Sequence, residues 1–165
     1  MLEKPLLERE YALNIAYQKF YYPFKNQFPD IKCVIAGSIR REKQFVHDID
    51  IIVVSKEQKI IDWCKSILQN CEGFLYLSGK LENIPTQIWF CKQENYGPML
   101  LMRTGPQEFS RKIASIAKKK GGTFSELGLF KGTPDNKNER IDVNSETSII
   151  WHTLHRKWIH PRDRY

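Results

Sequence analysis

The sequence predicts an α+β protein with two lobes, a mixed sheet with helices on one side and a smaller, basic α+β lobe after it. Short runs rich in Ile and Val, bounded by Gly or Pro, have the length of strands. Amphipathic stretches with helical spacing lie between these runs. The composition shifts after residue 103 and the second part of the chain is more basic, so we expect lobes over residues 1–103 and 104–165.

The first lobe is expected to begin with a helix over residues 5–22. Leu7, Tyr11 and Ile15 form an apolar i, i+4 stripe there, and Pro23 is expected to end the helix. The other elements expected in this lobe are strands near 32–36, 48–54, 74–77 and 86–91 and a helix over 59–68, while 96–102 is compatible with helix or strand.

The second lobe is expected to open with a helix from Thr104, which can act as its N-cap, to Lys120. The pair Gly121-Gly122 is expected to close this helix. The elements expected after it are two short strands within residues 127–143 and a last helix from Asn144 or Ser145 to about residue 155.

The composition indicates a folded, soluble, intracellular protein, either cytoplasmic or nuclear. Apolar residues make up 41% of the chain and aromatic residues 12%, which is enough to bury a core. The net charge of +7 fits a polyanionic partner and ordinary solubility charge equally well. The N-terminal stretch is charged from its third residue and no apolar run approaches membrane length, so we expect neither a secretory signal nor a membrane partner.

The four cysteines do not have the spacing of a disulfide scaffold or a zinc site. Cys33 and Cys91 lie within apolar, strand-like runs. We therefore expect buried thiols in a reducing compartment.

The stretch AGSIRREKQFVHDIDIIV, residues 36–53, places two acids at the start of an apolar strand. Because strand side chains alternate, Asp48 and Asp50 are expected on one face, with Cα atoms about 6.6 Å apart. Carboxylates so placed can bridge a pair of divalent ions of the kind used for displacement at phosphorus. Oxygen ligands favour Mg²⁺ or Mn²⁺ over softer metals.

The turn before this strand carries groups that suit a phosphate. Gly37 allows the backbone to approach an anion closely, and the Ser38 hydroxyl can donate to phosphate oxygens. Arg40 and Arg41 follow, and a guanidinium can hold a phosphate with two hydrogen bonds. Each feature alone is compatible with an ordinary surface turn, but the combination favours a nucleotide-plus-metal site.

These residues resemble the palm signature of the family X DNA polymerases, within the nucleotidyltransferase superfamily. Three later stretches resemble further parts of that family in the same order, namely IPTQIWFCKQENYGPMLLMRTG, KIASIAKKKGGTFSELGLF and IHPRDRY. The resemblance covers about residues 32–165. It implies a nucleotidyltransferase-type palm over 1–103 and a thumb-like lobe over 104–165, as in short members that keep only palm and thumb.

The resemblance also implies roles for single residues. Asp48 and Asp50 would ligate both metals; Gly37, Ser38, Arg40 and Arg41 would hold the triphosphate; Thr104 and Gly105 would lie against the incoming sugar; and Arg111, Lys112, Lys118, Lys119 and Lys120 would face DNA. The cofactors implied are two Mg²⁺ ions, with Mn²⁺ as a substitute. The partners implied are primer–template or gapped DNA and a deoxynucleoside triphosphate, and we expect a monomer.

One catalytic position departs from the family pattern. The family has a third carboxylate on the later palm strand, and counting back from Thr104 by the family spacing reaches Gln87. A neutral amide neither compensates the ion's charge nor acts as a base. Gln87 is either an introduced substitution, a natural mark of a binding protein descended from a polymerase, or a site where another acid stands in. Glu82 is expected on the wrong face, and the acids that the sequence leaves unplaced are Glu72, Glu94 and Asp142.

The leading hypothesis is a DNA-directed nucleotidyltransferase, a repair-type DNA polymerase that adds a deoxynucleoside monophosphate to a 3′ hydroxyl by a two-metal mechanism. Gln87 puts its turnover in question. The first alternative is a catalytically inactive, polymerase-like module that binds DNA or nucleotide. The second is a nucleotidyltransferase acting on RNA or protein, which the match through the second lobe disfavours.

Overall fold

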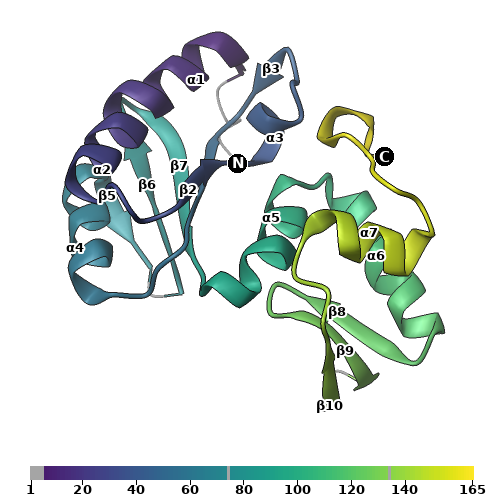
Figure 1. Ribbon diagram of the computed structural model, residues 1–165. Helices are drawn as coiled ribbons and strands as arrows, with labels where there is room; N and C mark the ends of the chain where they lie inside the picture. Colours follow the sequence, from purple (N-terminus) through teal and green to yellow (C-terminus); the bar gives the residue numbers. More distant parts are fainter. Residues whose placement is uncertain (1–5, 74, 134) are drawn as a thin grey trace. The chain divides into compact units, whose positions relative to one another are not determined.

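The computed structural model describes residues 6–73, 75–133 and 135–165. The chain forms two compact units, Met1–Lys92 and Gln93–Tyr165 (Figure 1). Among the described residues, no helix combines the length and the apolar composition that crossing a membrane requires.

The first unit contains a five-stranded mixed sheet. Its strands, in spatial order, are β2 (Cys33–Ile35), β4 (Ile49–Val53), β7 (Ile84–Phe90), β6 (Tyr76–Leu81) and β5 (Gln69–Glu72). Strands β4 and β7 run parallel, and every other neighbouring pair is antiparallel. Of the strand expected near 74–77, residues 76–77 begin β6, residue 75 precedes it and residue 74 lies outside the described residues.

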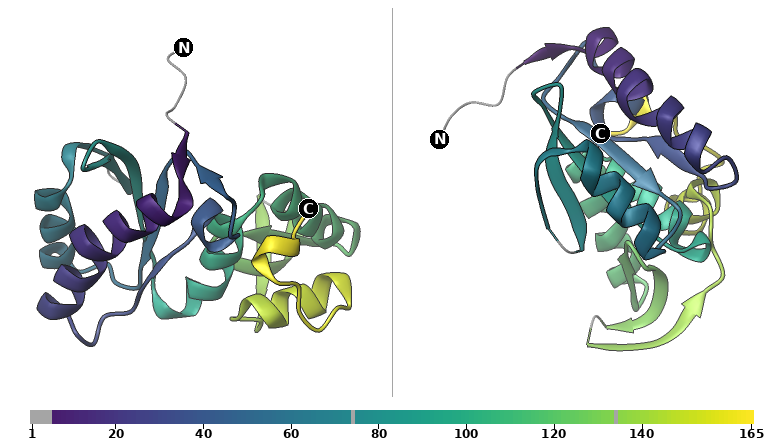
Figure 2. Two further views of the ribbon diagram at one scale, coloured as in Figure 1. Left: turned by 90° about the horizontal axis from the view of Figure 1, so that it is seen from above. Right: turned by 90° about the vertical axis from the view of Figure 1, so that its left-hand side faces the viewer.

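Helices cover one side of this sheet, as Figures 1 and 2 show. They are α1 (Arg9–Ala16), a π-helical turn (Tyr17–Tyr21), α2 (Tyr22–Gln27) and α4 (Gln58–Ile67). Buried side chains from the helices and from alternate strand positions form the core between them, including Phe20, Phe24, Ile51, Ile60 and Ile88. The predicted mixed sheet with helices on one side is therefore confirmed.

The expected end of the first helix at Pro23 is wrong, because the helical path continues to Gln27. The N–H of Tyr22 reaches the carbonyl of Tyr17, five residues back, so a wider π turn directly precedes the proline. Such bulges are places where a helix accommodates a residue that cannot continue the regular hydrogen-bond ladder.

The second unit packs three helices with a small antiparallel sheet. The helices are α5 (Tyr96–Thr104), α6 (Gln107–Lys119) and α7 (Glu146–Leu154), and the sheet order is β10 (Asn136–Ile141), β9 (Gly128–Thr133) and β8 (Gly122–Ser125). Its core includes Leu101, Phe109, Ile113, Phe124 and Ile149. Because α5 contributes to this core, the division falls after Lys92 rather than after residue 103. The small α+β second lobe is confirmed.

In this unit one local prediction is wrong and another is confirmed. Thr104 does not cap the following helix but is the last residue of α5, because Gly105 turns the backbone to φ +65°. The helix that follows begins at Gln107, after Pro106. The final helix is capped by Ser145, whose hydroxyl accepts a hydrogen bond from the N–H of Ser148 at 3.0 Å.

Cys33 and Cys91 are buried, as the sequence predicted, and each of the four cysteines is a thiol that takes part in no disulfide. Burial raises the pKa of Cys33 to about 11 and that of Cys64 to about 12. Both therefore remain protonated near neutral pH, which makes them poor nucleophiles.

A buried arginine holds the segment after α7 against the rest of the second unit. Arg164 Nη1 donates to Glu146 Oε1 at 2.9 Å, and Arg164 Nε donates to the carbonyl of Ile159 at 3.2 Å. The guanidinium carbon lies 5.5 Å from the ring centroid of Phe109 and 5.3 Å from that of Trp158. The two charged side chains are 0% and 6% exposed, so each depends on the other for compensation.

Glu146→Ala should destabilise the second unit by about 3–5 kcal/mol, because it leaves the Arg164 guanidinium buried without its carboxylate. Glu139→Ala is the matched control, because Glu139 pairs with Lys131 at 2.6 Å on the surface. The control should cost at most about 1 kcal/mol. Native-state hydrogen exchange of the α6 amides measures both losses, and equal values would contradict the anchoring role of Arg164.

Candidate active site

The candidate site forms where the turn after β2 meets the start of β4. The N–H of Ala36 donates to the carbonyl of Asp50 at 2.8 Å, which fixes the end of β2 beside that residue. Gly37 follows with φ +61°, and a Cβ built on it would lie 2.0 Å from Asp50 Oδ2. The carboxylate of Asp50 therefore occupies the space that any other residue at position 37 would fill.

The turn itself is a short helical segment, α3 (Gly37–Arg40). The N–H of Arg40 donates to the Ala36 carbonyl and the N–H of Arg41 donates to the Gly37 carbonyl, both at 3.2 Å. Ser38, Arg40 and Arg41 are half-buried. The hydrogen bonds thus hold the predicted phosphate-binding groups in one compact turn that begins against Asp50.

Asp48 directly precedes β4, and Asp50 is its second residue. Both aspartates are half-buried, whereas Ile49 between them is fully buried in the core under the helices. This pattern agrees with the alternation expected for two acids on the helix-free face of the sheet.

Gln87 lies beside Asp50 on the neighbouring strand. The parallel pairing of β4 with β7 puts Asp50 opposite Gln87, so the two residues are on adjacent strands about 4.8 Å apart. Thr86 and Ile88, on either side of Gln87, are buried, while Gln87 itself is half-buried. The residue reached by family spacing is therefore the cross-strand neighbour of Asp50.

Among the acids that the structure describes in the first unit, none stands in for the missing third carboxylate. Glu82 Oε1 is paired with Lys19 Nζ at 2.7 Å, so it is engaged with the helical layer. Glu72 is on β5, three strands from β4, which corresponds to about 14 Å. Among the described residues of this unit, no three His, Cys, Asp or Glu side chains are arranged to hold a metal.

The candidate ligands Asp48, Asp50 and Gln87 offer oxygen atoms. Two carboxylates and one amide oxygen suit a hard divalent cation such as Mg²⁺ or Mn²⁺, although with less charge than three carboxylates supply. Because Gly37 has no side chain, the turn approaches the Asp50 carboxylate closely. The oxygen atoms of these residues are therefore of the kind that binds such an ion. The neutral amide of Gln87 contributes the least charge to that binding.

The same face carries an aromatic pair that the sequence analysis did not single out. Tyr76 and Trp89 are cross-strand partners, and their ring centroids lie 4.0 Å apart in a stacked arrangement. Trp89 is two residues from Gln87, so both side chains belong to the helix-free face. Burial alternates along residues 84–90, but the sequence there does not alternate between polar and apolar residues, so no local pattern predicts this pair.

The residues predicted to contact the sugar and DNA lie in the second unit. Thr104 is fully buried at the end of α5, and its contact with a sugar remains a prediction. The cations Arg111, Lys112, Lys118 and Lys119 are exposed on α6, whose opposite face is buried through Phe109, Ile113 and Ala117.

Lys120 differs from these cations because it is engaged within the unit. Its Nζ donates to the carbonyls of His152 and Thr153 at 3.0 and 3.4 Å and lies 3.1 Å from His155 Nε2. The ammonium therefore compensates the carbonyl end of α7, where a positive charge is favourable. This gives Lys120 a structural contact that the sequence did not reveal.

Comparison with known proteins shows where this fold belongs. Residues 99–165 match the family described as the DNA polymerase beta thumb. Two proteins named Repair DNA polymerase X, from a warthog and a tick isolate of African swine fever virus, are also similar. The chain is a relative of the family X DNA polymerases.

The similarity to these family X polymerases is low and covers different shares of them. The warthog-isolate protein is 25% identical over 113 residues, which is 59% of this chain and 63% of that protein, less than two thirds of its length. The tick-isolate protein is 24% identical over 144 residues, which is 76% of this chain and 81% of that protein. The thumb match begins within α5, consistent with α5 belonging to the second unit.

Gly37→Ala should destabilise the first unit more than Gly121→Ala destabilises the second. Both glycines have a left-handed φ, +61° and +73°, which costs another residue about 1–2 kcal/mol. At Gly37 the new Cβ would also collide with Asp50, whereas at Gly121 no described atom lies within 4 Å. Hydrogen exchange of core amides in each unit measures the losses, and a smaller loss at Gly37 would refute the close contact with Asp50.

Proposed function

We propose that the chain is a DNA-directed nucleotidyltransferase, a repair-type DNA polymerase that adds a deoxynucleoside monophosphate to a 3′ hydroxyl and releases pyrophosphate. The observation that carries this proposal is the contact of the Asp50 carboxylate with the Gly37 turn, next to Gln87. It would join an acid that binds metal to a turn that binds phosphate, which is the combination that nucleotidyl transfer needs. The thumb match and the similarity to proteins named Repair DNA polymerase X support the choice of DNA as substrate.

Asp48 and Asp50 would hold two Mg²⁺ ions, or Mn²⁺ in their place, with the amide oxygen of Gln87 as an additional donor. Such ions, when bound, supply positive charge to both the attacking and the leaving oxygens of an in-line displacement. The two carboxylates would fix where that charge lies relative to the turn at Gly37.

The turn residues would bind the triphosphate. The Ser38 hydroxyl and the guanidinium of Arg41 would hold the β and γ phosphates, with Arg40 near them. Because the backbone of the turn is fixed against Asp50, the phosphates would be positioned at a set distance from the carboxylates. Thr104 and Gly105 would contact the sugar.

Gln87 would slow the chemical step more than it weakens nucleotide binding. In this position a carboxylate would both ligate a metal and accept the proton of the 3′ hydroxyl, and an amide cannot accept that proton. Gln87 lies outside α3, the turn that would bind the phosphates. We therefore infer a protein that binds DNA and triphosphate and transfers nucleotides slowly.

The second candidate function is a non-catalytic module that binds DNA or nucleotide. It is favoured by one observation, that no acid in the described part of the first unit replaces the missing carboxylate beside Asp50.

Gln87→Asp should increase the rate of primer extension on gapped DNA about a hundredfold or more, because it restores a carboxylate that can ligate metal and accept a proton. The measurement is single-turnover extension with Mg²⁺ and, separately, Mn²⁺. Gln87→Asn is the matched control, because it changes the length of the side chain in the same way without adding charge, and it should give no gain.

The combined variant Asp50→Asn with Gln87→Asp should extend no primer, because it gains a carboxylate at position 87 but loses the one at position 50. If Gln87→Asp extends no primer although it binds DNA and triphosphate like the parent chain, the polymerase proposal fails and the binding module takes its place.

Lys118→Ala and Lys119→Ala should each reduce the slope of log affinity for duplex DNA against log salt by about 0.9, as expected for one lost phosphate contact. Lys120→Ala should change that slope less, since its ammonium binds the α7 carbonyls, and should instead lower thermal stability. Fluorescence anisotropy over a salt series gives the slopes. Unchanged slopes for Lys118 and Lys119 would rule out this end of α6 as a DNA contact.

A further inference from the structure

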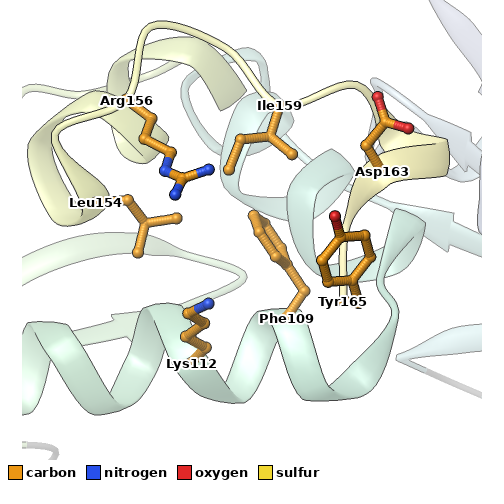
Figure 3. Close-up of a pocket in the computed structure, with 7 residues that line it drawn as sticks. All are labelled: Phe109, Lys112, Leu154, Arg156, Ile159, Asp163 and Tyr165. Carbon is orange, nitrogen blue, oxygen red and sulfur yellow. The ribbon is translucent and has the colours of Figure 1, made fainter.

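The second unit contains a cavity of about 390 Å³ that the proposed chemistry does not use (Figure 3). It lies between α6 and the segment after α7 and is lined by Phe109, Lys112, Arg156, Ile159, Asp163 and Tyr165. Its volume is within the range of small-ligand pockets in proteins. Every lining residue belongs to this unit, so the cavity is complete within it.

Two cations face this cavity from opposite walls. Figure 3 shows Lys112 extending from α6 and Arg156 extending from the other side, with their nitrogen atoms directed toward the space between. Within the described part of the chain, neither has an ion-pair partner. The acid at the other end, Asp163, lies 3.9 Å from Arg162 Nε, which offsets its charge. The cavity therefore has an excess of positive charge on the side of Lys112 and Arg156.

An aromatic ring lies at the other end of the cavity. Tyr165 lines it and is 86% exposed, so one face of the ring is available to a ligand. Trp158 is exposed by 43% in the segment after α7, and Trp151 of α7 is exposed by 54%. Exposed aromatic rings interleaved with cations are typical of surfaces that bind single-stranded nucleic acid, where bases stack on rings and cations contact phosphates.

The wall that carries these groups is held in place before any ligand arrives. The buried guanidinium of Arg164 ties the segment to Glu146 of α7 and packs over Phe109 of α6. Arg164 directly precedes Tyr165, and Phe109 is itself part of the lining. A site fixed in this way loses less conformational entropy on binding.

We propose that this cavity binds one nucleotide unit of a single-stranded nucleic acid, with the phosphate between Lys112 and Arg156 and the base stacked on Tyr165. Asp163 is placed to accept a hydrogen bond from a base amino group or a sugar hydroxyl. The inference rests on the proposed function only for the class of partner. The strand segment bound here is distinct from the primer end that would react in the first unit.

The test is the binding of a fluorescent oligothymidylate of about six nucleotides, measured by anisotropy over a salt series. Arg156→Ala should weaken binding and reduce the slope of log affinity against log salt by about 0.7, the value for one phosphate contact on a single strand. Arg156→Lys should retain the slope. Lys157→Ala is the matched control, because it removes the adjacent exposed cation, which does not line this cavity, and it should change the slope less.

Tyr165→Ala should weaken binding about fivefold or more with an unchanged salt slope, since it removes stacking without removing charge. Tyr165→Phe should bind like the parent chain. Equal effects of Arg156→Ala and Lys157→Ala, or no effect of Tyr165→Ala, would overturn the proposal.

The identity of the ligand is tested with the same variants. If they abolish binding of a phosphotyrosine peptide and leave oligothymidylate binding unchanged, the cavity belongs to a phosphoprotein and the proposal is wrong. None of these measurements requires turnover. A failure of primer extension and a failure of this site are therefore distinguishable.

Discussion

The carboxylate of Asp50 and the backbone of Gly37 share a space that admits no side chain at position 37. A Cβ there would lie 2.0 Å from Asp50 Oδ2, so glycine is required both for its left-handed φ and for this contact. The contact joins two features that lie 13 positions apart in the chain, the turn that would hold phosphates and the acid that would hold a metal. Their relative position is set by the antiparallel pairing of β2 with β4, not by any flexible side chain. The chemistry proposed for the first unit depends on that arrangement.

The parallel pairing of β4 with β7 determines the second property of the site. It puts Gln87 directly opposite Asp50, where its amide is the neutral member of an otherwise acidic set. The strands are arranged as the proposed metal-assisted transfer requires. The Gln87 side chain, however, lacks the charge and the basicity that such a transfer requires. In the proposed mechanism, the presence of an amide rather than a carboxylate at position 87 separates a polymerase from a binding module. The second unit is independent of this question, since its fold and its cavity contain no residue of the first unit.

The sequence was most informative where periodicity and spacing act locally. The alternation around Asp48 and Asp50 and the family spacing to Gln87 anticipated β4, β7 and their polar face. The continuation of the first helix past Pro23 was not predictable, because it depends on a π turn that shifts the hydrogen bonds before the proline. The engagement of Lys120 with α7 and the anchoring of Arg164 join residues 32 and 18 positions apart, and no local pattern encodes such contacts. Charged residues that look alike in the sequence therefore have different roles in the fold.

A crystal structure of the chain with Mn²⁺ and a non-hydrolysable deoxynucleoside triphosphate, with Mn²⁺ located by its anomalous scattering, tests the central claim most directly. The account predicts Mn²⁺ in contact with Asp48 and Asp50, the β and γ phosphates on the turn that begins at Gly37, and the Gln87 amide oxygen facing the same region. Mn²⁺ and phosphates bound away from this turn, or an Asp50 carboxylate directed away from Gly37, would contradict it.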